Sequence, residues 1–393
     1  MIEMKDMTRR LLTLLAAAAL ALSCSITRIE GPGPLSGAPL GSGFRAAAPG
    51  LPVTVAHRGC WLKEGKDFYI NENCVAGVLM AARYGYPAIE CDVKYTRDSV
   101  MVLMHDETIN RTMRNASDYS PIGEPVRVRD LAFGELRSKY VLASTDPSLR
   151  VPIPTLEELL AACREYGVVP MLHSEVVDSY RLAHDMLGDG FIAFSASQRD
   201  VSHARDWSEN CLVLLDPGID DAPKTVSRLS GIGGPCGMST MKYGMLDSAY
   251  IAAVKAAGFD VQASIFPSPH EQRAVRDGVT IQLSDFWWFQ PSGRKVLCSE
   301  RKKGIRMTEG DSFSWNPEVP DFCAVTVEVE FEGSLEVSLA GRVYVLSGGK
   351  GAVPVGTRLY KARPDVRVKA LSDSRIKSFV AKVHDCGPTN PER

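Results

Sequence analysis

Short apolar or β-branched runs alternate with amphipathic helical patterns from Pro52 to about Val296, and this alternation limits the fold more than any other feature. It is typical of a parallel sheet whose strands are joined by helices. Eight strand–helix units in about 245 residues predict a (β/α)8 TIM barrel, an α/β fold, with a doubly wound open sheet as the alternative. We assign residues 52–297 to it. The predicted strands are Val53–Ala56, Ala88–Val93, Val169–His173, Phe191–Ser195, Leu212–Leu215, Gly237–Thr240, Val261–Ile265 and Val279–Leu283.

A further run, Val100–Met104, follows the second strand too closely to be another barrel strand. Only Tyr95–Ser99 separate the two, whereas a parallel crossover needs a dozen residues or more. We therefore expect a hairpin excursion after the second strand, which turns back and brings His105 toward the carboxyl end of the barrel. Thr155 and Glu158 have the spacing of a capping box at the start of a later helix.

Helical periodicity is lost after about Cys298, and alternating segments separated by glycine turns follow. They predict a small all-β sandwich as an accessory domain over residues 298–393. Its expected role is to stabilise the barrel; alternatively, Tyr344 and Phe379 with exposed polar residues form a shallow glycan-binding site. Cys298, Cys323 and Cys386 allow one disulfide, and the sequence does not decide which two pair. The predicted strands are Val325–Phe331, Leu335–Leu339, Arg342–Leu346, Val366–Ala370 and Ile376–Val383.

The N-terminus has the pattern of an export signal, in which basic residues precede the apolar run Leu11–Leu22. This run is too short to span a bilayer as a mature helix. Ala21-Leu22-Ser23-Cys24 is similar to a bacterial lipobox, although Ala21 replaces the usual leucine, and it predicts a lipidated Cys24 after a signal peptide over residues 1–24. Plain secretion and an uncleaved buried helix are the alternatives. Residues 25–51, rich in Gly, Pro, Ser and Ala, are expected to form a flexible tether. The expected location is the bacterial cell envelope, on its periplasmic or outer-surface side.

Charge and cysteine usage exclude several classes of function. The net charge of -2 and pI near 6.4 argue against a basic surface that binds nucleic acid. None of the ten cysteines forms a C-x-x-C pair, so a zinc cluster or a dense disulfide framework is not indicated. Any recognition of an anion must therefore be local.

Two short motifs at predicted strands carry groups suited to chemistry on a phosphate. His57 and Arg58 directly follow the first strand; histidine transfers protons near neutral pH, and arginine binds phosphate through its fork. Glu90 and Asp92 lie two apart in the second strand and therefore on one face. Adjacent carboxylates need a neutralising partner, and oxygen ligands favour Mg²⁺ or Ca²⁺. The alternative is that both acids face solvent and the residues between them are buried.

Taken together, these motifs resemble the glycerophosphodiester phosphodiesterase family in order and spacing. The resemblance covers roughly residues 53–291 and excludes the tether and the β-domain. It rests on His57-Arg58-Gly59, Asn71-Glu72-Asn73, Ile89-Glu90-Cys91-Asp92-Val93, Thr96-Arg97-Asp98, His105-Asp106, Arg111-Thr112, Ile153-Pro154-Thr155-Leu156-Glu157-Glu158, Ala257-Gly258-Phe259-Asp260-Val261, Asp277-Gly278-Val279 and Ser284-Asp285.

The resemblance implies a role for each matched residue. Glu90 and Asp92 would be metal ligands. His57 and His105 would be the acid and the base, in an order that the sequence does not reveal, and Arg58 would hold the phosphate. Glu72 would orient Arg58 or a histidine, or would simply be an acid at a helix N-terminus.

The sequence departs from the family pattern at two strands. The third acid of the family lies in a Glu-Ile-Lys strand, whereas this chain has Met171-Leu172-His173-Ser174-Glu175-Val176-Val177 and no lysine nearby. We favour Glu175 as the third metal ligand; His173 is the alternative ligand, and both are expected on the same face. In the seventh strand, Ala263-Ser264-Ile265 replaces Trp-Thr-Val. Trp287 would then line the substrate pocket in compensation, or would only pack between domains.

The expected activity is metal-dependent hydrolysis of a glycerophosphodiester, or of a related polyol or sugar phosphodiester, to an alcohol and a phosphomonoester. One alternative is a phospholipase that cleaves a lipid headgroup. The other is an inactive barrel that serves as a surface binding protein, which the missing lysine mildly favours.

Overall fold

The computed structural model describes residues 26–30, 52–218, 220–240, 248–264, 276–285, 295–320, 322–348, 352–360 and 363–385. Within them the chain forms two compact units, a barrel and a β-sandwich, which meet in sequence near residue 291. Cys24, Cys386 and Trp287 lie outside the described residues. In the described part of the chain, no helix has both the length and the apolar character needed to cross a membrane.

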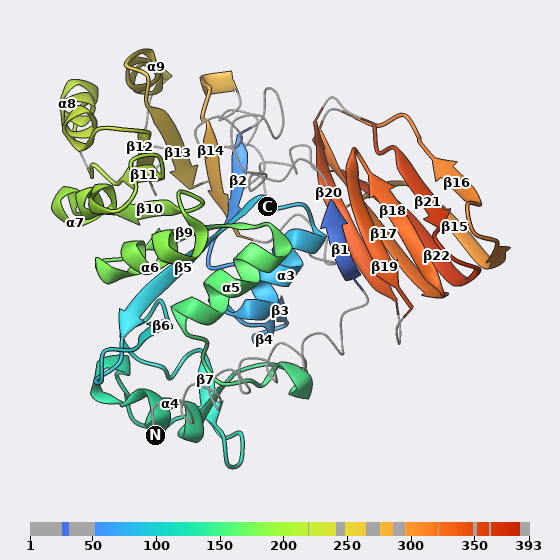
Figure 1. Cartoon of the computed structure of the whole chain (residues 1–393), viewed down its shortest axis with the longest axis horizontal. Helices are drawn as coiled ribbons and strands as arrows, with labels where there is room; N and C mark the ends of the chain where they lie inside the picture. Colours follow the sequence, from blue (N-terminus) through green and yellow to red (C-terminus); the bar gives the residue numbers. More distant parts are fainter. Residues whose placement is uncertain are drawn as a thin grey trace. The chain divides into compact units, whose positions relative to one another are not determined.

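Eight parallel strands close into a barrel, which excludes the open sheet (Figure 1). Closure is seen at β2, which pairs with β14 on one side and with β5 on the other. Each predicted strand is found within one or two residues of its expected bounds, because each is a short apolar run ended by polar or turn residues. The strands are β2 (Val53–Ala56), β5 (Ala88–Tyr95), β9 (Val169–His173), β10 (Ile192–Ser195), β11 (Leu212–Leu215), β12 (Cys236–Thr240), β13 (Asp260–Ser264) and β14 (Ile281–Ser284).

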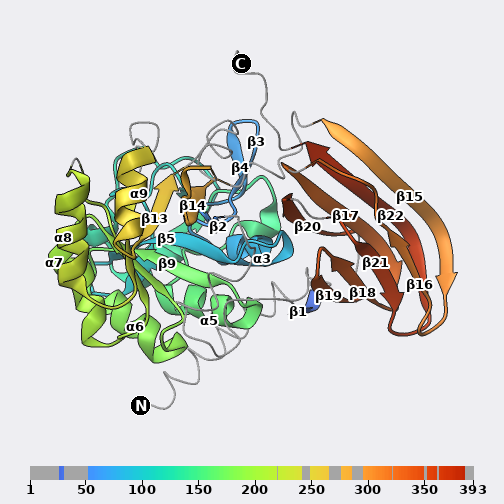
Figure 2. The ribbon, with the colours of Figure 1, turned by 90° about the horizontal axis from the view of Figure 1, so that it is seen from above.

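Helices connect these strands, and α6, α7, α8 and α9 lie outside them in Figure 2. The capping box is confirmed: the Thr155 hydroxyl accepts from the Glu158 backbone N–H, and the Glu158 carboxylate accepts from that of Thr155. The helices are α3 (Val75–Arg83), α5 (Leu156–Tyr166), α6 (Asp178–Leu187), α7 (Gln198–Ser202), α8 (Ala222–Ile232) and α9 (Ser248–Ala256), with α4 (Phe133–Lys139) in the excursion after β5.

The excursion after β5 begins with the predicted hairpin. Strand β6 (Met101–Leu103) runs antiparallel to the end of β5, with Val93 opposite Leu103. Strand β6 and the segment that follows share a separate apolar core, which includes Val102, Met104, Ile109 and Leu136. This second core fixes the excursion, so His105 lies on an ordered support. Two small hairpins complete the region: β3 (Leu62–Glu64) with β4 (Asp67–Ile70), and β7 (Met113–Asn115) with β8 (Tyr140–Leu142).

The β-sandwich consists of two antiparallel sheets that enclose one apolar core (Figure 2). The first sheet has the order β1-β19-β18-β21-β16 and the second β15-β22-β17-β20. The strands are β1 (Ile26–Glu30), β15 (Val296–Met307), β16 (Ser312–Trp315), β17 (Phe322–Glu332), β18 (Ser334–Leu339), β19 (Arg342–Ser347), β20 (Val353–Tyr360), β21 (Val366–Ala370) and β22 (Ser374–Asp385).

Four of these strands were not predicted. Strand β1 lies within the expected tether but pairs antiparallel with β19, so residues 26–30 are not a flexible linker. Its sequence Ile-Thr-Arg-Ile-Glu carries β-branched residues that favour a strand once a partner edge is available. Strand β15 is rich in charge, β16 is short, and β20 contains a proline and a glycine, so none of them shows a clear apolar alternation.

The alternative of a shallow glycan site on the β-domain is contradicted at both of its aromatic residues. Tyr344 and Phe379 are fully buried in the sandwich core. Both stand at inward positions of the strand alternation, and the hydroxyl of Tyr344 donates a hydrogen bond to the carbonyl of Gly356, at 3.2 Å.

A disulfide between Cys298 and Cys323 is excluded. Strands β15 and β17 lie on opposite sides of β22, so their backbones are about 9.5 Å apart, too far for a disulfide. Pairing of either cysteine with Cys386 stays a prediction.

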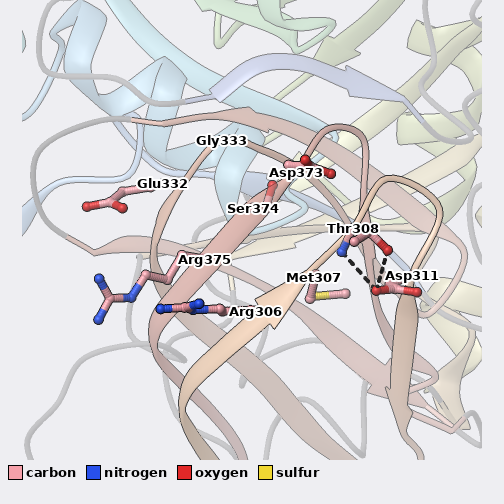
Figure 3. Close-up of a pocket in the computed structure, with 9 residues that line it drawn as sticks. All are labelled: Arg306, Met307, Thr308, Asp311, Glu332, Gly333, Asp373, Ser374 and Arg375. Atoms are coloured by element: carbon pink, nitrogen blue, oxygen red, sulfur yellow. Dashed lines mark hydrogen bonds between the residues drawn. The ribbon is translucent and has the colours of Figure 1, made fainter.

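An open hollow of about 510 Å³ lies at one end of the sandwich (Figure 3). Arg306 and Arg375 stand side by side on β15 and β22, while Glu332 on β17 is paired with Lys377. The labelled side chains are mostly exposed and share no buried polar network. Among the described residues, the only group with metal-ligand spacing belongs to the barrel.

Candidate active site

Polar side chains gather inside the barrel where four neighbouring strands end. His57 follows β2, Glu90 and Asp92 lie in β5, His173 ends β9, and Asp285 follows β14. Each stands two or four residues beyond an apolar residue of the barrel core: Val55, Ala88, Met171 and Leu283, respectively. Since strand residues two apart share a face, Glu90, Asp92 and His173 point into the barrel. His57 and Asp285 come directly after the ends of β2 and β14, and their side chains meet at 2.8 Å. The alternative in which the two acids face solvent is therefore wrong.

Glu90, Asp92 and His173 form a group whose ligand atoms all lie within 4.8 Å of one another. His173 Nδ1 is 3.3 Å from Asp92 Oδ1 and 3.7 Å from Glu90 Oε1. The side chain of Glu90 is only 2% exposed, that of Asp92 9% and that of His173 45%. The group is thus open to solvent on the histidine side and closed beneath the acids.

Electrostatics favour a cation in this group. Burial raises the pKa of Glu90 well above its usual value, and the neighbouring Asp92 raises it further. Burial also acts to raise the pKa of Asp92, but hydrogen bonds from His173 and Asn73 outweigh it, so that pKa lies below its usual range. A divalent cation bound by these three residues would remove the cost of keeping both carboxylates charged. The residues therefore fit a divalent cation.

Two residues in left-handed backbone conformation hold the acids in place. Arg58 has φ 55° and donates its backbone N–H to Glu90 Oε2 at 2.7 Å. Asn73 has φ 53°; its side-chain amide donates to Asp92 Oδ2 and accepts from the Asp92 backbone N–H, both at 2.9 Å. The Asn73 backbone N–H in turn donates to the carbonyl of Arg58 at 2.8 Å. Strained backbone of this kind, held by several hydrogen bonds, is typical of functional sites.

Each of the two predicted catalytic histidines has a carboxylate partner. His57 Nδ1 lies 2.8 Å from Asp285 Oδ1, across 228 residues of sequence. His105 Nδ1 lies 2.7 Å from Asp106 Oδ1. A carboxylate at Nδ1 fixes the proton there and leaves Nε2 as the atom that accepts or donates a proton in a reaction.

A chain of hydrogen bonds through Glu72 connects Arg58 with His105. Its carboxylate accepts from Arg58 at 3.2 Å and from both terminal nitrogens of Arg111 at 2.7 and 2.8 Å. Arg111 also donates to Asp106, whose pKa it lowers to about 2, with a smaller contribution from His105. Arg58 Nε is buried, has no hydrogen-bond partner and lies 4.0 Å from Asp92. A buried guanidinium donor without a partner is suited to an anionic ligand.

The structure separates the two alternatives for the third ligand. His173 lies in the metal group, whereas Glu175 is exposed and does not belong to it. Both were expected on one face, but β9 ends at His173, so strand alternation no longer applies at Glu175. Our preference for Glu175 is therefore not supported by the geometry.

Four other residues acquire a role only in the structure. Asp285, Asp106, Arg111 and Asn73 occur in the quoted motifs, but nothing in their local sequence assigned them a partner. Asp106 and Asn73 directly follow His105 and Glu72, and this adjacency was the one available signal.

Residues 57–185 match the model of the Glycerophosphoryl diester phosphodiesterase family. Glycerophosphodiester phosphodiesterase 1 of Mus musculus is 32% identical over 119 residues, which are 29% of this chain and 31% of the mouse protein. A probable glycerophosphodiester phosphodiesterase 1 of Mycobacterium tuberculosis is 33% identical over 85 residues, 22% of this chain and 28% of that protein. The chain thus spans about a third of the length of the curated relatives it matches.

The barrel is also similar to a solved structure. A protein of Silicibacter pomeroyi, assigned as a glycerophosphoryl diester phosphodiesterase, superposes with a TM-score of 0.50 over 61% of this chain and 91% of its own, at 17% identity. At that identity the similarity supports the fold alone. The stretch matched by the family model contains every predicted site residue except Trp287.

Proposed function

We propose that this chain, which carries a glycerophosphoryl diester phosphodiesterase domain over residues 57–185, is a metal-dependent phosphodiesterase. Its substrate would be a glycerophosphodiester, or a related polyol or sugar phosphodiester, and its products an alcohol and a phosphomonoester. The observation that carries the proposal is one arrangement: two histidines, each paired with an aspartate, stand beside the Glu90, Asp92 and His173 group and Arg58, whose Nε is buried without a hydrogen-bond partner.

The residues divide the work of phosphodiester hydrolysis. A cation held by Glu90, Asp92 and His173 would neutralise part of the phosphate charge. Arg58 binds a non-bridging phosphate oxygen, while Glu72 holds its guanidinium in place. One histidine takes a proton from the attacking oxygen through Nε2, and the other gives a proton to the leaving alkoxide. Asp285 and Asp106 stabilise the imidazolium form of their respective histidines.

A metal titration of the purified chain tests the proposal. Hydrolysis of glycerophosphocholine and of bis-p-nitrophenyl phosphate would be measured after chelation and on return of each divalent cation. We expect activity to be lost on chelation and restored by a cation, and Glu90→Gln to lower turnover by at least about 10². Full activity after chelation would overturn the metal assignment, and no turnover of either substrate with any cation would favour the inactive binding protein. Cleavage of intact phospholipid vesicles in preference to soluble diesters would favour the phospholipase.

We also propose that the protein is exported to a bacterial cell envelope and anchored through a lipidated Cys24. The anchor would then stand two residues before β1, so the lipid would be attached next to the β-sandwich. Cys24→Ala should move the protein from the membrane fraction to the soluble fraction. Membrane retention of this variant would point to another anchor.

A further inference from the structure

The donor set of the metal group contains one imidazole nitrogen and two carboxylates. The expectation of Mg²⁺ or Ca²⁺ was drawn for oxygen ligands alone. Mg²⁺ and Ca²⁺ bind oxygen and have little affinity for imidazole, whereas Mn²⁺, Co²⁺ and Zn²⁺ accept nitrogen and oxygen together. Replacement of one oxygen donor by His173 therefore changes which ions the group prefers.

The spacing of the donors fits a shared ion. Atoms bound to one ion at about 2.1 Å lie roughly 3.0–3.4 Å apart in octahedral or tetrahedral geometry. His173 Nδ1 is 3.3 Å from Asp92 Oδ1 and 3.7 Å from Glu90 Oε1, close to this range, and all three donor atoms lie within 4.8 Å of one another.

The setting of the ring argues that His173 is more than a counter-charge for Asp92. Nearly half of its side chain is exposed, yet Nδ1 faces the two buried acids, at 3.3 Å from Asp92 and 3.7 Å from Glu90. The ring also packs against Phe194, with ring centres 4.5 Å apart and planes tilted by 34°, which restricts its rotation. Phe194 belongs to the barrel core, so the orientation of the imidazole is built into the fold.

We infer that the Glu90, Asp92 and His173 group selects a first-row transition-metal dication of the Mn²⁺, Co²⁺ or Zn²⁺ class over Mg²⁺ and Ca²⁺, and that His173 sets this preference. The inference rests on the metal site of the proposed phosphodiesterase and is independent of its substrate.

Direct metal binding by the purified full chain tests the inference without an activity assay. Affinities for Co²⁺, Mn²⁺, Zn²⁺, Mg²⁺ and Ca²⁺ would be measured by competition with a chelator, and Co²⁺ would also be followed through its visible absorption. Since Co²⁺ and Zn²⁺ bind most sites more tightly than Mg²⁺, the decisive quantity is the change in the affinity ratio on mutation. We expect His173→Glu, which restores three oxygen donors, to reduce the Co²⁺ to Mg²⁺ ratio by about 10–100-fold and to alter the Co²⁺ spectrum.

Two control variants match the test residue. His203→Gln removes another histidine that is 45% exposed and pairs with an aspartate, Asp206, at 2.8 Å. Glu175→Gln removes the charge of the acid that lies outside the group. Both should leave the ratio unchanged, and a change in either variant as large as in His173→Glu would overturn the inference.

The outcomes separate this inference from the proposed function. A chain that hydrolyses phosphodiesters, but whose affinity ratio is the same in wild type and in His173→Glu, would overturn the inference and leave the function standing. A chain with His173-dependent selectivity that hydrolyses no phosphodiester would support the inference and overturn the function.

Discussion

The mouth of the barrel and the core of the β-sandwich treat buried polar groups in opposite ways. In the barrel, Glu72, Glu90, Asp92 and Asn73 are each more than nine-tenths buried. Asn73 is hydrogen-bonded to Asp92, and Glu72 and Glu90 both accept hydrogen bonds from Arg58. In the sandwich, the described core cluster is made of apolar side chains, and Tyr344 supplies its one hydroxyl. Buried charge costs stability unless it is paired, so its concentration in one place points to function there and to a structural role for the other core.

The largest expected effect is the loss of turnover when a histidine of the barrel site is removed. His57→Ala and His105→Ala should each lower turnover of an unactivated phosphodiester by about 10²–10⁴, because each transfers a proton in the reaction. This is roughly 3–5 kcal/mol of barrier, and the double variant should lose little more than either single one. Steady-state kinetics of the three variants on glycerophosphocholine give the measurement.

The leaving group distinguishes the acid from the base. A p-nitrophenolate leaving group needs little protonation, so the variant that lacks the acid should recover much of its rate on bis-p-nitrophenyl phosphate, while the variant that lacks the base should not. Equal losses on both substrates would remove this division of roles.

Loss of a core aromatic should show the reverse pattern. Phe379 is fully buried on β22 and packs edge-on against Phe313, with ring centres 5.1 Å apart. Phe379→Ala should destabilise the sandwich by about 3–5 kcal/mol through the cavity it leaves, with turnover unchanged under conditions where the chain is folded. Urea unfolding, with hydrogen exchange to locate the loss, provides the test. If the folded variant lost as much turnover as the histidine variants, the sandwich core would not have a purely structural role.

A smaller effect is expected at a barrel residue that does not belong to the candidate active site. Thr155 caps α5, and Thr155→Ala removes the side-chain half of the capping box. We expect a loss of about 1 kcal/mol in the free energy of unfolding, and Thr155→Ser, which keeps the hydroxyl, should retain most of it. Turnover should not change in either variant. A tenfold fall in the turnover of Thr155→Ala would show that a barrel residue outside the site also controls activity, and this would contradict the prediction.

The fold could be predicted where the signal is local. The barrel strands and the hairpin after β5 follow from apolar runs, their spacing and the length of the connections. The sandwich was predicted less completely because β15 and β1 become strands only beside β22 and β19, and their own residues show no apolar alternation that would reveal it. The sequence left open whether Tyr344 lies at the surface, because a single aromatic residue in a strand does not reveal which of its two faces the other sheet will cover.

The sequence by itself determined that Glu90 and Asp92 share a face, that His57 and Arg58 stand at a strand end and that His105 returns on a hairpin, since strand periodicity and loop length are properties of neighbouring residues. Only the tertiary structure decided that His173 rather than Glu175 joins the acids, because this depends on the residue at which β9 ends. It also decided that Asp285 pairs with His57, because closure of the barrel brings β14 beside β2, and no local pattern encodes a contact across 228 residues.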